Sequence, residues 1–156
     1  MAVKPIPDGF HTVTPHIVVD NASEAIDFYK KAFNAEEIMS MPAPDGKIMH
    51  ALIKIGDSFV MLNDEFPDMG AKGPKSIGGT GVTLSLYVEE VDKVFERAAN
   101  AGAEVVMPVA DQFWGDRYGM LKDPYGHQWA VATHKSDLTH EQILEAAAKQ
   151  FGAGSC

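Results

Sequence analysis

Residues 123–129 read DPYGHQW and end the longer stretch DQFWGDRYGMLKDPYGHQW, residues 111–129. Asp-Pro opens a turn readily, and Gly126 can take a positive φ, so the sequence predicts a β-hairpin whose turn spans Asp123–Gly126. His127 follows the turn and is expected to hold the hairpin through a hydrogen bond. Trp129 is expected to point toward the core.

The same order of elements occurs twice in the chain. Ala35-Glu36 precedes the strand EIMSM, and Ala103-Glu104 precedes the strand VVMPV, 68 positions later (35 to 103). Lys54 and Lys122 stand before the two hairpin turns with the same offset (54 to 122). The sequence therefore predicts two tandem β-α-β-β-β modules, at residues 11–63 and 82–134.

Each of the two module helices has a sequence pattern that marks one of its ends. Asn21 and Glu24 form an Asn-x-x-Glu capping-box pattern before a helix with Ile26, Tyr29 and Phe33 on one face. The second helix lies in EEVDKVFERAANAG, residues 89–102, and is expected to end at Gly102. It presents one apolar face, made of Val91, Val94, Phe95 and Ala98.

Two further segments lie outside the modules. Residues 64–81 are rich in glycine and proline and predict a linker or mobile loop. Thr139 and Gln142 form a second capping box, which opens a tail helix over 139–151. Its apolar stripe must be buried either against its own domain or against a partner subunit, and the sequence leaves both open.

The composition excludes several classes of function. The chain has 156 residues, a formal net charge of −9 and one cysteine. An acidic chain repels nucleic acid and anionic membrane. A single thiol cannot form an internal disulfide, and neither a signal peptide nor a membrane-spanning run is visible, so we expect a cytoplasmic protein.

The paired modules, together with AIDFYKKAF at 25–33 and DPYGHQW at 123–129, resemble the vicinal oxygen chelate superfamily. That superfamily contains glyoxalase I, bleomycin-resistance proteins and extradiol dioxygenases, and the resemblance covers about residues 11–134. It implies an α+β fold in which two tandem modules form a cup-shaped mixed sheet, followed here by a C-terminal helix. It also implies a homodimer. In enzymatic members it implies a divalent metal held by His, Glu or Gln on the first and last strands of each module.

The positions that the resemblance assigns to metal ligands carry unsuitable residues. In the second module they fall on Thr83 and Ala130. In the first module the hairpin position falls on Met61, or on Val60 if the register slips by one. The remaining position is Thr14 or His16, and only His16 is a plausible ligand. We therefore expect neither the standard metal nor another cofactor.

Hairpin register predicts which side chains face the cup. A turn over Asp123–Gly126 would pair Lys122 with His127, which places Arg117, Gly119, Leu121 and Gln128 in the cup with Ala130. Tyr118 and Met120 would then face the helices. The predicted ligand pocket consists of His16, His50, Met61, Thr83, Ser85, Tyr87, Trp114, Arg117, Gln128 and Ala130.

Three hypotheses follow for the function. The first is a metal-free protein that binds a small planar or anionic molecule in the cup, with Arg117 as the anion contact. The alternative is an enzyme of the same fold, of lyase, isomerase or dioxygenase type, with His16 or His50 in a non-standard centre. In the third, the pocket is vestigial and the protein is a scaffold.

Overall fold

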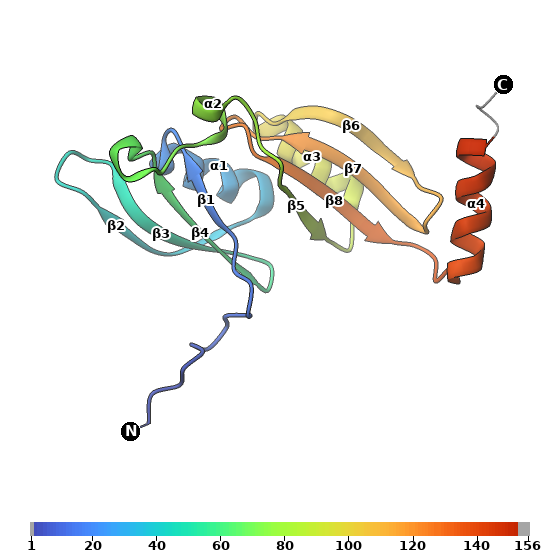
Figure 1. Cartoon of the computed structure of the whole chain (residues 1–156), viewed down its shortest axis with the longest axis horizontal. Coiled ribbons are helices and arrows are strands. Elements are labelled where there is room, and N and C mark those ends of the chain that lie inside the picture. The colour runs from blue at the N-terminus through green and yellow to red at the C-terminus, as the bar shows by residue number, and fades with distance from the viewer. Residues whose placement is uncertain (1, 153–156) are drawn as a thin grey trace.

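The structure is a computed structural model that describes residues 2–152, and it contains two four-stranded sheets with one long helix each (Figure 1). Module one consists of β1 (His16–Val19), α1 (Ala22–Phe33), β2 (Glu36–Pro42), β3 (Ile48–Ile55) and β4 (Ser58–Asp64). Module two consists of β5 (Thr83–Tyr87), α3 (Val91–Ala101), β6 (Glu104–Asp111), β7 (Asp116–Lys122) and β8 (Gln128–His134). The predicted α+β fold of two tandem β-α-β-β-β modules is confirmed.

The two sheets share one topology. Their strand orders are β1-β4-β3-β2 and β5-β8-β7-β6. The first strand of each module runs parallel to the last, and the other pairs are antiparallel. The linker between the modules contains a 3-10 helix, η1 (Pro67–Met69), and a short helix, α2 (Pro74–Ile77).

The helix signals read from the sequence are confirmed. The Glu24 N–H donates to Asn21 Oδ1 at 3.2 Å, and the Asn21 amide donates back to the Glu24 carboxylate at 3.0 Å. At the end of α3, Gly102 has φ +124° and its N–H reaches the last turn of the helix. These caps satisfy backbone groups that would otherwise lack partners, which is why they fix the helix ends.

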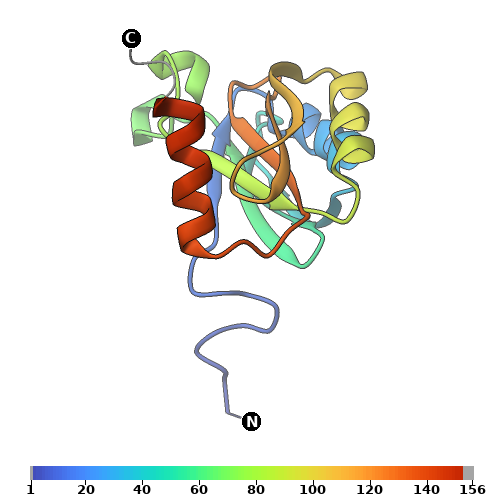
Figure 2. The same ribbon diagram turned by 90° about the vertical axis from the view of Figure 1, so that its right-hand side faces the viewer.

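The two modules share one core. Trp129 of β8 packs on Phe33 and Tyr29 of α1, with ring centroids 4.8 and 5.4 Å apart. Figure 2 shows α1 and α3 on one side of the sheets. The core prediction for Trp129 is confirmed, since its side chain is fully buried.

A buried carboxylate joins the modules beneath this aromatic cluster. Asp123 accepts hydrogen bonds from Tyr29 Oη at 2.6 Å and from Trp129 Nε1 at 2.8 Å. Burial, followed by the nearby Asp123 charge, raises the pKa of Tyr29 well above its usual value, so this phenol remains a donor. His127 Nε2 lies 2.8 Å from Val18 O, so its ring contacts strand β1 of module one.

The tail helix α4 (His140–Gly152) begins at the predicted capping box. The Gln142 N–H donates to Thr139 Oγ1 at 3.2 Å, and the Thr139 N–H donates to Gln142 Oε1 at 2.9 Å. None of the described side chains of α4 is buried. Phe151 contacts Phe113 edge-on at 5.7 Å between centroids. Figure 2 places α4 on the side of the sheets opposite to α1 and α3.

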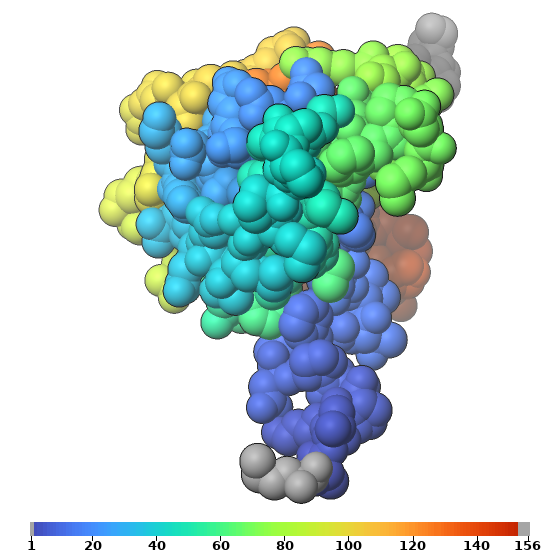
Figure 3. Space-filling model, turned by 90° about the vertical axis from the view of Figure 1, so that its left-hand side faces the viewer, coloured from blue at the N-terminus to red at the C-terminus, as the bar shows by residue number. Residues whose placement is uncertain are grey.

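The N-terminal arm, residues 2–15, runs away from module one (Figure 3). Phe10 lies against Phe59 at 4.7 Å between ring centroids, which attaches the inner end of the arm to β4. Among the helices of residues 2–152, none is long and apolar enough to cross a membrane.

Candidate functional site

The β7–β8 hairpin decides which side chains of module two face away from the helices. Lys122 pairs with Gln128 and Met120 pairs with Ala130, so the predicted register is wrong by one residue. His127 belongs to the turn, because the Asp123 N–H donates to His127 O at 2.9 Å. Asp123 Oδ1 also accepts the N–H groups of Tyr125 and His127 at 2.9 Å each. These bonds stabilise a five-residue turn in place of the four-residue turn that the sequence suggested.

The corrected register reverses the face of every β7 side chain. Directly paired residues of neighbouring strands share a face. The face opposite to α3, here called the open face of module two, therefore carries side chains from three strands: Thr83, Ser85 and Tyr87 of β5, Asp116, Tyr118, Met120 and Lys122 of β7, and Gln128, Ala130, Ala132 and His134 of β8.

Arg117 faces the other way and is committed to an ion pair. Its Nε and Nη2 donate to the two oxygens of Asp92 at 2.8 Å each, and Nη1 donates to Asp111 at 3.2 Å. The hydrogen bonds that Arg117 donates to these carboxylates raise its pKa further above its already high value. The prediction that Arg117 lines the cup is therefore wrong, and so is the placement of Gly119 and Leu121. Leu121 is fully buried in the core beneath the sheet.

The face of the module-one sheet opposite to α1, here called the open face of module one, carries both histidines of the predicted pocket. His16 lies opposite Met61 on the face away from α1. Its Nε2 is 2.5 Å from Asn63 Oδ1, while Asn63 Nδ2 donates to Asp64 O at 2.7 Å. Because the amide nitrogen of Asn63 is used as a donor, its oxygen is the acceptor, and His16 Nε2 must be the donor. His50 lies edge-on to His16, with ring centroids 5.8 Å apart.

A buried carboxylate, Asp116, lies at one end of the open face of module two. It accepts hydrogen bonds from Tyr87 Oη at 2.8 Å and from Trp114 Nε1 at 3.1 Å through Oδ2. Its Oδ1 lies 2.8 Å from His134 Nδ1. Burial alone would raise the pKa of Asp116, but the hydrogen bonds from His134, Tyr87 and Trp114 outweigh it, and the pKa lies below its usual value.

No pattern in the sequence indicated that Asp116 lies beside His134. They are 18 residues apart, and the register that placed Asp116 on the helix side concealed their proximity. Two members of the predicted pocket, Tyr87 and Trp114, do meet at this carboxylate. Trp114 also contacts Tyr118 edge-on at 5.5 Å between ring centroids.

The four superfamily ligand positions do not form a metal site. Thr83 and Ala130 lie on the same face of module two, but a hydroxyl and a methyl group offer no carboxylate or imidazole donor. In module one, His16 stands opposite the thioether of Met61. Within residues 2–152, no three His, Cys, Asp or Glu side chains are grouped so that they could hold a metal ion. The residues present do not fit the superfamily's metal.

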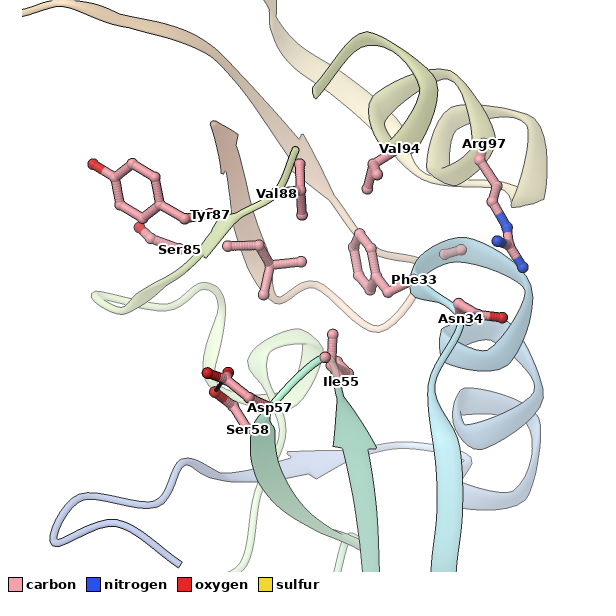
Figure 4. Close-up of a pocket in the computed structure, with 13 residues that line it drawn as sticks. Phe33, Asn34, Ile55, Asp57, Ser58, Ser85, Tyr87, Val88, Val94 and Arg97 are labelled. Atoms are coloured by element: carbon pink, nitrogen blue, oxygen red, sulfur yellow. Dashed lines mark hydrogen bonds between the residues drawn. The ribbon is translucent and has the colours of Figure 1, made fainter. Parts of the chain in front are cut away.

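A cavity of about 490 Å³ lies between the modules, beside strand β5. Figure 4 shows Ser85 and Tyr87 at one end of it and Arg97 at the other, with Phe33 and Ile55 between them. Arg97 donates through Nε to Lys31 O at 2.5 Å and through Nη2 to Lys30 O at 3.3 Å, so its guanidinium binds the end of α1. The cavity is large enough for a small organic molecule.

Comparisons with known proteins agree with this fold. The model of the Glyoxalase/Bleomycin resistance protein/Dioxygenase superfamily matches residues 9–131. Uncharacterized protein Mb0911c of Mycobacterium bovis is 49% identical over 141 residues, which cover 88% of this chain and 93% of that protein.

Two solved structures illustrate the similarity in fold. The structure of TioX from Micromonospora sp. ML1 has a TM-score of 0.63 and 26% identity, covering 83% of this chain and 100% of that chain. The fosfomycin resistance protein FosX from Listeria monocytogenes, in complex with Mn(II) and sulfate, has a TM-score of 0.62 and 18% identity, covering 86% and 97%. At this identity the likeness to FosX shows the fold alone.

Proposed function

The chain belongs to the Glyoxalase/Bleomycin resistance protein/Dioxygenase superfamily, and from this premise we propose that it binds a small organic molecule on its open sheet faces without the superfamily's standard metal. The observation that carries the proposal is the pair Thr83 and Ala130. The strands that would present metal ligands are formed and in register, yet a neutral hydroxyl and a methyl group stand where the superfamily site needs His, Glu or Gln.

The chemistry of the open faces favours a planar or anionic ligand. Tyr87 and Trp114 supply aromatic surface on module two, and His16 and His50 supply imidazole groups on module one. Arg117, which the sequence suggested as the anion contact, is engaged by Asp92 on the other face. An anionic group would therefore be bound by the imidazole of His50 and by the hydroxyls of Thr83 and Ser85, because the Nε2 N–H of His16 already donates to Asn63.

We also propose that the protein is a homodimer whose second copy covers the open faces. The outer strands β2 and β6 expose several large apolar side chains, which a single chain leaves in water. They are Ile38, Met39 and Met41 on β2, and Val105, Val106 and Met107 on β6. Sedimentation velocity of the full chain tests this proposal: a monomer at tens of micromolar would contradict it.

Thermal shift and isothermal titration with a panel of aromatic acids and other small anions test binding. A ligand should raise Tm with a concentration dependence that matches its Kd. Ni²⁺, Mn²⁺ and Zn²⁺ are tested in parallel. Stabilisation by any of these ions at low micromolar concentration would overturn the metal-free part of the proposal.

The alternative is an enzyme of the same fold that uses His16. One observation favours it: because Asn63 accepts from His16 Nε2, the other ring nitrogen, Nδ1, carries the lone pair in the neutral ring. A general base needs such a fixed tautomer. Activity toward glyoxals, epoxides and catechols is compared between the unmodified chain and the double variant H16A/H50A. Unchanged activity in the double variant would remove this alternative.

A further inference from the structure

His134 is held between two carboxylates that belong to different parts of the chain. Its Nδ1 lies 2.8 Å from Oδ1 of Asp116, which is buried in the sheet. Its Nε2 lies 2.8 Å from Oδ1 of Asp137, which is fully exposed and belongs to the segment that leads from β8 to α4. The imidazole therefore links module two to the connection that carries the tail helix.

We propose that His134 is a protonation-dependent latch that fixes residues 135–139, and with them α4, to module two. An imidazole has two N–H donors only when it is protonated. In the neutral ring, one nitrogen has a lone pair and cannot donate. Both carboxylates can therefore be hydrogen-bonded at the same time only by the imidazolium.

When the ring loses a proton, only one of the two carboxylates keeps its hydrogen-bond donor. The free-energy cost of losing that donor differs between them. Asp116 is buried, so leaving it without the His134 donor costs more than leaving the exposed Asp137 to water. The remaining proton should therefore stay on Nδ1. Nε2 then turns its lone pair toward the Asp137 carboxylate, and this contact becomes repulsive.

Several polar and charged groups surround the His134 ring. Tyr87 of β5 and Trp114 before β7 donate to Asp116, and Tyr118 shares the face. Asp111 at the end of β6 and Lys135 lie at the neighbouring surface depression that Asp116 also lines. The hydrogen bonds that His134 donates to Asp116 and Asp137 raise its pKa, so the latch is closed at pH 6.5 and opens on the alkaline side.

Few other contacts hold the connection beyond Ser136. The N–H groups of Lys135 and Ser136 donate to Gly115 O at 2.9 and 3.0 Å, which anchors only the start of the segment. Farther along, Leu138 lies near Gly115, and Phe151 contacts Phe113. Loss of the Asp137 contact should therefore let α4 move. Figure 1 shows α4 beyond the end of module two and Figure 2 shows it on the open-face side, so a displacement of α4 would change what lies beside that end of the open face.

Nuclear magnetic resonance on the full chain tests the latch. The ring signals of His134 give its midpoint, and the backbone amides of residues 137–151 report the segment and the helix. We expect these amides to shift with the His134 midpoint, and their heteronuclear relaxation to show greater motion above it. The D137N substitution is at an exposed position and should leave the fold intact. In this variant the titration midpoint of His134 should fall, and the amide shifts of residues 138–151 should no longer change with pH at the His134 midpoint.

H140Q is the matched control, because it removes the ionisable ring on the first residue of α4 and leaves the latch in place. It should retain the His134 midpoint and the coupled amide shifts. If the amides of α4 do not follow His134 in the unmodified chain, or if D137N keeps the same coupling, the latch is wrong.

Discussion

Met120 lies directly opposite Ala130 across the β7–β8 hairpin, where a four-residue turn would have placed Gly119. The pairing of Met120 with Ala130 determines which side chains of β7 lie on the open face. It moves the guanidinium of Arg117 to the helix side and brings Asp116 to the face that also carries Tyr87 and His134. The open face of module two therefore presents a buried carboxylate and an imidazole where the sequence predicted a guanidinium.

The first prediction concerns Arg117, which the structure makes a stabilising residue and not a ligand contact. The R117Q variant should lower Tm by no more than about a few degrees, because its partner Asp92 is largely exposed. Ligand affinity should be unchanged. D92N should give a similar loss, and added salt should reduce both losses. A variant with unchanged Tm and abolished binding would return Arg117 to the pocket.

The second prediction concerns Asp123, the carboxylate between the modules. Its two oxygens accept from Tyr29, Trp129 and two backbone N–H groups of its own turn. D123A leaves these donors without an acceptor in the core, so the free energy of unfolding should fall by about 3 kcal/mol or more. Urea denaturation followed by tryptophan fluorescence measures this loss.

Asp45 provides the matched control for Asp123. It lies in the turn between β2 and β3, is exposed, and accepts only the Lys47 N–H at 3.1 Å. D45A should cost about 1 kcal/mol or less. Similar losses in both variants would mean that Asp123 does not join the two modules.

The third prediction is a pH dependence. The pKa of His134 is raised in the folded protein, so its contribution is fully present below the ordinary histidine value of about 6.5 and is lost as pH rises through the folded-state value. The Tm difference between the unmodified chain and H134Q should therefore be larger at pH 6 than at pH 9. Differential scanning calorimetry at matched ionic strength measures it, and a difference that grows with pH would have the wrong sign.

The elements could be predicted from the sequence because their signals are local. Asn21 with Glu24 and Thr139 with Gln142 cap the helices that they precede, and Gly102 ends α3. Thr83, Ser85 and Tyr87, which the sequence predicted in one pocket, share a face of β5, and Leu84 and Leu86 between them pack against the core.

The site could not be predicted as well because it depends on interactions that the local pattern does not contain. The length of the hairpin turn is set by Asp123, whose side chain accepts two backbone N–H groups at once. His127 holds its own hairpin through its backbone groups, as expected, but its ring also contacts Val18, which is 109 residues away in the chain. A register error of one residue then reversed the face of each side chain of β7.

The last prediction tests whether side chains alone account for the missing metal site. Thr83 pairs with Gln128 and Ser85 pairs with Ala130, so Thr83 and Ala130 are diagonal neighbours on one face of parallel strands. Long side chains at such positions can meet. In the double variant T83H/A130E, imidazole and carboxylate should therefore bind a divalent ion together, although Ala130 is almost fully buried and the glutamate should lower stability without metal.

Thermal denaturation with and without Ni²⁺ provides the measurement. A site with a Kd of roughly 10 μM should stabilise the double variant by about 2.7 kcal/mol at roughly 1 mM Ni²⁺. The single variants T83H and A130E are the controls and should respond far less, because each offers one new ligand. An equal response of the unmodified chain would show that it already binds the ion elsewhere. A double variant that stays folded but ignores Ni²⁺ would show that the strand geometry, and not only its side chains, has departed from that of a metal site.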